Sequence, residues 1–161
     1  MTDTVLQILL VLLGAILGTL GTLLYEQQKD KRRAANVSML LCQEIERNVA
    51  TLAGLLQTVN AYLIPNLPQK IDPLSFKEIA QRVEAACETS SLQAVRSDLP
   101  LLEPENTRAV LDFYNSCRDV PNNLRDIERF AGNIRSGLFQ SNIQMLIDKG
   151  IKAIAKLRKT A

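Results

Sequence analysis

Histidine and tryptophan are absent from this chain of 161 residues, and cysteine occurs only three times. Without histidine, the sequence excludes a Ser-His-Asp triad, a Cys-His nucleophile pair, a histidine metal ligand and an imidazole pH switch. Three cysteines are too few for a Cys₄ zinc site, although a metal site made only of Asp and Glu stays open. We therefore expect a protein that is not an enzyme and that holds no metal and no cofactor.

Neither sign of charge dominates, since 19 basic and 17 acidic side chains leave a formal net charge of +2. This balance argues against a dedicated nucleic-acid binder, so we expect no sequence-specific contact with DNA or RNA. The spacings of Cys42, Cys87 and Cys117 match no metal or redox motif. Each cysteine is more typical of a small core residue than of a nucleophile.

The first feature that is present is a long apolar run. Residues 5–25 read VLQILLVLLGAILGTLGTLLY and contain no charged side chain. As a helix with a rise of about 1.5 Å per residue, the run covers about 30 Å, the thickness of a hydrocarbon core. The alternative, a cleaved signal peptide, would need a basic start, a shorter apolar core and a cleavage site. Here Asp3 is the only charged residue before the run, and Glu26 follows it, so we expect an uncleaved transmembrane signal anchor.

The charges that flank this run predict its orientation. Basic residues occur only on its C-terminal side, at Lys29, Lys31, Arg32 and Arg33. Because basic flanks stay in the cytoplasm, residues 1–4 should lie outside the cell, and the juxtamembrane segment 26–36 and residues 37–161 should lie inside. We expect a single-pass protein of the inner (cytoplasmic) membrane.

One face of the predicted span differs from the others. On a helical projection, all glycines of the run and its only amide fall within about one third of the circumference. This glycine face contains Gln7, Val11, Gly14, Gly18, Gly21, Thr22 and Tyr25. Small residues let helices approach closely in lipid, although they are also common in membrane helices generally. We expect the face to mediate homo-oligomerisation, and a ring of such helices could line a pore with Gln and Thr.

After Tyr25 the apolar residues recur at helical spacing, with no alternation typical of strands. We therefore expect an all-α protein, in which a cytoplasmic bundle of four to five helices follows the span. The first helix could continue from the membrane to about residue 63, before the break at 64–68. Its apolar stripe is Val37, Leu41, Ile45, Val49, Leu52, Leu55, Leu56, Val59 and Leu63.

The other helices are predicted from caps and breakers. A second helix should start near Ser75, a short amphipathic piece should cover 92–96, and a connector should cover 99–104. A third helix should begin at Pro104 or Glu105, be kinked or split at Pro121 and stop at Gly137, and the last should start near Ser141. Their expected core residues are Phe76, Ile79, Ala80, Val83, Cys87, Val110, Leu111, Tyr114, Cys117, Leu124, Ile127, Ala131, Ile134, Ile143, Leu146, Ile147, Ile151, Ile154 and Leu157.

Asn48 interrupts the apolar stripe of the first cytoplasmic helix. A buried amide needs hydrogen-bond partners. We favour a residue that fixes the register of the helices by bonding to a facing helix or to the Tyr114 hydroxyl. The alternative is a ligand pocket within the bundle.

Two groups of basic residues are candidates for contact with anions or lipids. An arginine group, Arg118, Arg125 and Arg129, would suit an anionic ligand such as a nucleotide, although pairing with Asp119, Asp126 and Glu128 on a solvated face is the commoner explanation. A lysine group, Lys149, Lys152, Lys156 and Lys159, would suit anionic lipid headgroups. Cations near a helix C-terminus are also favourable without any ligand.

Two functions follow from this layout. In the first, the bundle senses a cytoplasmic protein or an anionic ligand, and the anchored helices act on the membrane, with a pore as one form of that action. In the second, the chain is a passive anchor that recruits a cytoplasmic partner. The span at 5–25 followed by a compact helical domain resembles small membrane effectors of bacterial phage-defence and CRISPR-associated systems. Some of these contain a HEPN-like ribonuclease fold, whose Arg-x₄₋₆-His motif this chain cannot have. The resemblance implies an antiviral, membrane-perturbing role without RNA cleavage.

Overall fold

The structure is a computed structural model that describes residues 2–62, 76–130 and 137–159. Every regular element in this part of the chain is a helix, which confirms the all-α prediction. The elements are α1 (Thr2–Tyr62), α2 (Phe76–Ala86), α3 (Ser90–Ala94), the 3-10 helix η1 (Arg96–Leu101), α4 (Pro104–Phe130) and α5 (Gly137–Leu157). Side chains are described for residues 10–60, 78–125 and 140–159.

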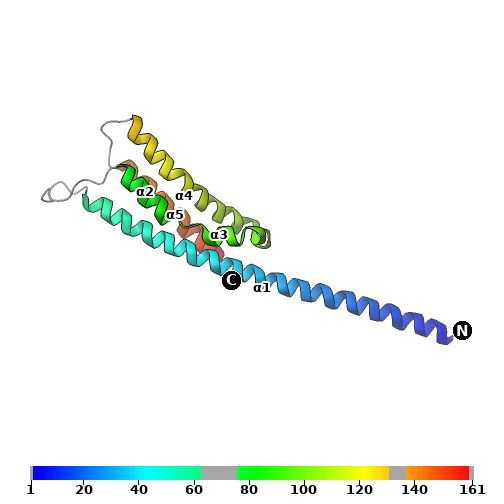
Figure 1. The fold of residues 1–161 in the computed structure, drawn as a ribbon. Helices are drawn as coiled ribbons and strands as arrows, with labels where there is room; N and C mark the ends of the chain where they lie inside the picture. The colour runs from blue at the N-terminus through cyan, green and yellow to red at the C-terminus, as the bar shows by residue number, and fades with distance from the viewer. Residues whose placement is uncertain (1, 63–75, 131–136, 160–161) are drawn as a thin grey trace.

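Helix α1 is a single rod of 61 residues. No proline occurs before Pro65, and no glycine lies between Gly21 and Gly54, so nothing in this stretch favours a break. Figure 1 shows its first half projecting alone from one end of the molecule, while its second half lies within the bundle. The same helix therefore provides both the apolar run and one wall of the core.

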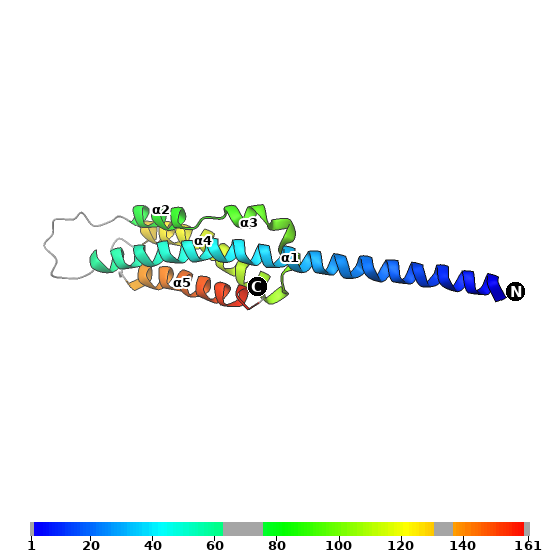
Figure 2. The same cartoon turned by 90° about the horizontal axis from the view of Figure 1, so that it is seen from below.

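The bundle packs the second half of α1 against α5, while α4 packs against both α5 and α2. Figure 2 shows α2 and α3 on one side of α1 and α5 on the other. The predicted stripe of α1 is confirmed, because its residues from Val37 to Val59 are buried or pack against the core, while Leu63 lies outside the described residues. Removing such apolar side chains from water contributes about 1.5–3 kcal/mol each.

The boundaries of two helices differ from the prediction. Gly137 begins α5 instead of ending the preceding helix, so α5 starts four residues before Ser141. The Gln140 amide donates to the Asn60 side-chain oxygen at 2.7 Å, which holds this earlier turn against α1. Helix α4 is not split at Pro121, since that residue is buried between the core residues Val120 and Leu124, whose burial favours a continuous helix.

Two expected core residues are exposed. Leu111 is 39% and Ile151 53% exposed. The adjacent positions explain this, because Phe113, which the prediction missed, is fully buried in α4, and Gly150 takes the core position in α5. Of the other predicted core residues, Phe76, Ile127, Ala131 and Ile134 lie outside the described side chains.

Candidate interaction surfaces

The first half of α1 carries an apolar surface that the bundle does not cover. Every described side chain from Leu10 to Arg33 is exposed, and large apolar residues such as Val11 and Leu24 expose 73% and 66% of their surface. Among the described helices, α1 is the one that is long and apolar enough to cross a membrane. Monomeric soluble proteins rarely expose a contiguous apolar patch of this extent, and such a surface is typical of a segment that contacts lipid or another protein.

The glycine face lies open along this half. A Cβ built on Gly14, Gly18 or Gly21 would meet no other atom within 4 Å. The hydroxyls of Thr19 and Thr22 donate to carbonyl oxygens of their own helix, so they need no partner from a second chain. Tyr25 is exposed at the end of the face, whereas Gln7 belongs to α1 but its side chain lies outside the described ones.

The basic flank forms the transition from the apolar half of α1 to the bundle. Lys29, Lys31 and Arg32 are exposed. The Arg33 guanidinium donates to Asp98 of η1 at 2.8 Å, and this ion pair lies closer to the apolar run than the first buried residue, Val37. The pair is partly exposed, so it contributes at most about 1 kcal/mol, but it marks where η1 meets α1.

A buried carboxylate joins three elements inside the bundle. Glu44 of α1 is 0% exposed. It accepts hydrogen bonds from the Tyr114 hydroxyl at 2.5 Å, from the Ser90 hydroxyl at 2.9 Å and from the Ser91 backbone N–H at 2.6 Å. A buried charge is tolerated when its lone pairs are satisfied in this way. Glu44 therefore anchors α3 and α4 to α1.

The same contacts determine the protonation states of Glu44 and Tyr114. Burial opposes ionisation of Glu44, but the hydrogen bonds from Tyr114, Ser91 and Ser90 outweigh it, and they hold the pKa of this carboxyl below its ordinary value. Burial and the hydrogen bond to Glu44 raise the pKa of the Tyr114 phenol. Glu44 is thus ionised and Tyr114 neutral at neutral pH, a structural pairing that moves no proton.

Asn48 lies one turn further along α1 and is also buried. Its amide donates to the Glu88 carbonyl oxygen at 2.8 Å, and its oxygen accepts from the Glu88 N–H at 3.3 Å. The partner is therefore the backbone between α2 and α3 instead of Tyr114, whose hydroxyl is bound to Glu44. This two-point contact fixes the level at which the α2–α3 connection crosses α1.

The arginine group is not gathered at one site. Arg118 pairs with the adjacent Asp119, whereas Arg125 pairs with Glu84 of α2. Arg129 lies in α4, but its side chain is outside the described ones. The contacts that the structure shows are therefore the ion pairs of a solvated surface, each with its own carboxylate.

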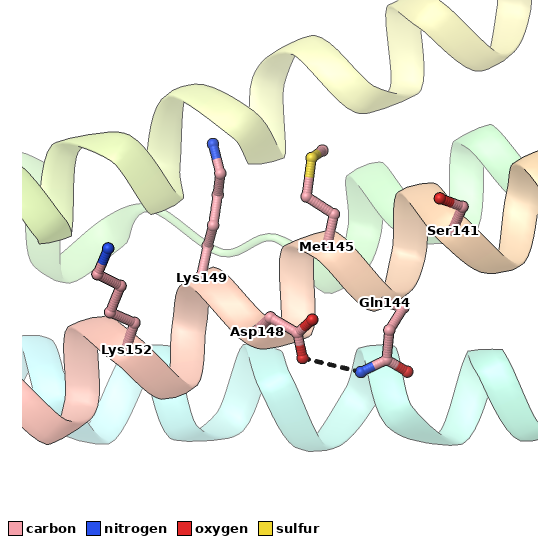
Figure 3. Close-up of a pocket in the computed structure, with 6 residues that line it drawn as sticks. All are labelled: Ser141, Gln144, Met145, Asp148, Lys149 and Lys152. Carbon is pink, nitrogen blue, oxygen red and sulfur yellow. Dashed lines mark hydrogen bonds between the residues drawn. The ribbon is translucent and has the colours of Figure 1, made fainter.

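The lysine group lies along the seam between α4 and α5. Lys149 binds Asp112 at 3.1 Å and the Ser116 hydroxyl at 2.7 Å, and Lys156 binds Glu105. Figure 3 shows Lys149 and Met145 directed from α5 toward α4, while Asp148 bonds to Gln144 on another side of α5. Lys152 and Lys159 are exposed.

A hollow of about 500 Å³ follows this seam, lined by four basic and two acidic residues. The lining includes Glu105, Arg108, Asp112, Lys149, Lys152 and Lys156. Because the two carboxylates already pair with Lys149 and Lys156, the seam has a mixed charge instead of a concentrated positive one. In the described ranges no three His, Cys, Asp or Glu residues gather as metal ligands.

Comparisons of the chain with protein-family models, with curated proteins and with solved structures find no match.

Proposed function

We propose that the chain is a single-pass membrane protein with its N-terminus outside and its bundle in the cytoplasm. It self-associates through the glycine face, and its bundle responds to a cytoplasmic protein or an anionic ligand and acts on the membrane through α1. The observation that carries this proposal is that one unbroken helix has an exposed apolar half and a half that forms the bundle core. Such a helix links any change in the bundle to the membrane segment without a flexible joint.

Apolar burial, backbone hydrogen bonding and the flanking charges all favour a transmembrane position for the apolar half of α1. Leaving each large apolar side chain of Leu10–Tyr25 in water costs about 1.5–3 kcal/mol relative to burying it. In a helix, every backbone group of this segment is satisfied internally, as a hydrocarbon environment requires. Lys29, Lys31 and Arg32 on the bundle side favour a cytoplasmic bundle.

Alkaline carbonate extraction and protease protection test the span and its orientation together. The full chain, with an epitope tag at each end, should remain in the membrane pellet at pH 11. Protease added to intact spheroplasts should remove the N-terminal tag and spare the C-terminal one. Release by carbonate, or recovery of a mature chain without residues 1–25, contradicts the span. Removal of the C-terminal tag instead contradicts the orientation.

The action on the membrane is proposed to be a loss of its barrier, as in a membrane-perturbing defence effector. Expression should depolarise the cells, as measured with a potential-sensitive dye, and the effect should disappear in the Gly14→Leu, Gly18→Leu double variant. The matched control replaces two small residues on a neighbouring face, with Ala15→Leu and Thr19→Leu, and should retain the effect. Normal potential under every inducing condition contradicts the membrane action and leaves the second candidate, a passive scaffold anchored by the same span.

A further inference from the structure

The unbroken course of α1 sets how far each part of the bundle lies from the membrane. If the hydrocarbon core ends at Tyr25, Arg33 lies about 12 Å further along the helix, at about 1.5 Å per residue. The headgroup layer on one side of a bilayer is about 5–7 Å thick. The level of Arg33 is therefore about 5–7 Å beyond the headgroups, within the reach of a long side chain.

The 3-10 helix η1 is the part of the bundle that meets α1 at this level. Its Asp98 binds Arg33, and its Leu99 is buried. Figure 2 shows the turn from α3 into η1 at the end of the bundle that faces the free half of α1. On η1, Arg96, Ser97 and Pro100 are exposed, so η1 presents a basic side chain two residues before the Asp98–Arg33 contact.

The middle of α5, which carries Lys149 and Lys152, lies further away. Gly150 contacts Val49, which is about 36 Å along α1 from Tyr25 at about 1.5 Å per residue. At physiological ionic strength charges are screened over about 8 Å. Arg96 and the basic flank are therefore close enough to the membrane for electrostatic contact, whereas Lys149 and its neighbours are not.

We propose that Arg96 of η1, together with Lys29, Lys31 and Arg32, binds phosphate groups of the phospholipid headgroup layer, so that η1 lies on the membrane surface. This inference depends on the proposed span. Charge complementarity supports it, because guanidinium and ammonium groups pair with phosphate. The acidic neighbours Glu26, Asp30 and Glu103 fit the ammonium groups of zwitterionic headgroups, while Asp98 is held by Arg33.

Tryptophan fluorescence tests the contact cleanly, because the chain has no tryptophan of its own. Three single-tryptophan variants of the full chain place the probe in η1 (Ser97→Trp), in the span (Leu20→Trp) and in the part of α4 remote from η1 (Asn123→Trp). All three positions are exposed, so the probe does not disturb the core. Each variant is reconstituted into phosphatidylcholine vesicles that carry a spin-label quencher either on the headgroup or within the acyl chain, and circular dichroism checks the fold.

Headgroup quenching of Ser97→Trp should exceed that of Asn123→Trp at least threefold. Adding Arg96→Glu should bring it close to the Asn123→Trp level, whereas the control Arg118→Glu should leave it unchanged. Equal headgroup quenching of Ser97→Trp and Asn123→Trp overturns the inference. Headgroup quenching of Ser97→Trp that does not change when Arg96→Glu is added also overturns it. Acyl-chain quenching of Leu20→Trp shows separately whether the apolar half of α1 lies in the bilayer. Strong quenching of Leu20→Trp without headgroup quenching of Ser97→Trp therefore contradicts the η1 contact alone, and absence of both contradicts the span.

Discussion

Gly150 of α5 packs directly against side chains of α1 and α4. A Cβ at this position would stand 2.3 Å from Cγ2 of Val49 and 3.1 Å from Cε2 of Phe113. Gly150→Ala should therefore lower the free energy of unfolding by about 1–3 kcal/mol, the usual cost of overpacking. Chemical denaturation of the full chain in detergent, followed by circular dichroism, measures the loss.

Gly54→Ala is the matched control for this change. Gly54 is also a helical glycine, but a Cβ there would meet nothing within 4 Å, so the variant should gain about 0.5–1 kcal/mol from the better helix former. Adding Val49→Ala to Gly150→Ala should restore part of the lost stability. Equal effects of the two glycine variants would show that helix propensity, and not close packing, governs Gly150.

Glu44 gives the bundle a pH-dependent stability. Its folded-state pKa is lowered, so its contribution is complete above the ordinary carboxyl pKa and is lost as the pH falls through the folded value. Glu44→Gln should cost about 1–3 kcal/mol at pH 7, because it weakens charged hydrogen bonds to Tyr114, Ser90 and Ser91. Denaturation midpoints of the two proteins should begin to converge below the ordinary pKa of glutamate, about 4.3, and should meet only below the lowered folded-state pKa. A difference that persists there would contradict the assignment to the carboxylate.

The sequence predicted that Asn48 is buried and bonded, but not which group it bonds. Periodicity shows that a residue faces the core, and that information also existed for Glu44, which lies three residues after Leu41 on the buried face. A charged residue is normally assigned to the surface, so apolar periodicity does not by itself predict the burial of Glu44. The partners of both residues come from the α2–α3 connection and α4, which are remote in sequence, and only the fold brings them together.

At the level of single elements, the glycine face of α1 is the surface through which we propose that copies of the chain associate. Gly14→Leu with Gly18→Leu should shift the detergent-solubilised protein from a homo-oligomer toward a monomer, because leucine prevents close approach of the backbones. The control Ala15→Leu with Thr19→Leu should leave the mass unchanged. Sedimentation or native mass spectrometry measures the mass, and a wild-type protein that is already monomeric contradicts the association.

Helix ends that follow from apolar spacing and capping residues were predicted well, whereas breaks assigned to Gly137 and Pro121 were not found. The end of α1 and the starts of α2 and α4 agree with the prediction within one or two residues, because apolar spacing and capping residues are local signals. Gly137 and Pro121 are conventional breakers, yet contacts outweigh both: Gln140 binds Asn60, and Val120 and Leu124 are buried. Because Pro100 is also a conventional helix breaker, residues 99–104 were expected to be a connector, whereas 96–101 form the 3-10 helix η1.

For the whole molecule, the bundle should fold without the exposed first half of α1. The described core begins at Val37, and none of the described residues 10–33 is buried. A fragment of residues 34–161 should therefore be helical, water-soluble and cooperative in thermal unfolding. Circular dichroism and sedimentation test this, and a fragment that aggregates or lacks a cooperative transition would show that the first half of α1 is needed for the fold.

The continuous α1 also restricts how the chain could change its length. Each residue inserted between Tyr25 and Val37 moves the bundle by about 1.5 Å and turns it by about 100° relative to the span. An insertion of one or two residues would therefore point the bundle in a new direction around the axis, while seven or eleven residues, close to two or three full turns, would preserve the original direction. Spacer length and angular register are thus linked in this protein, and only insertions close to a whole number of turns preserve the direction of the bundle.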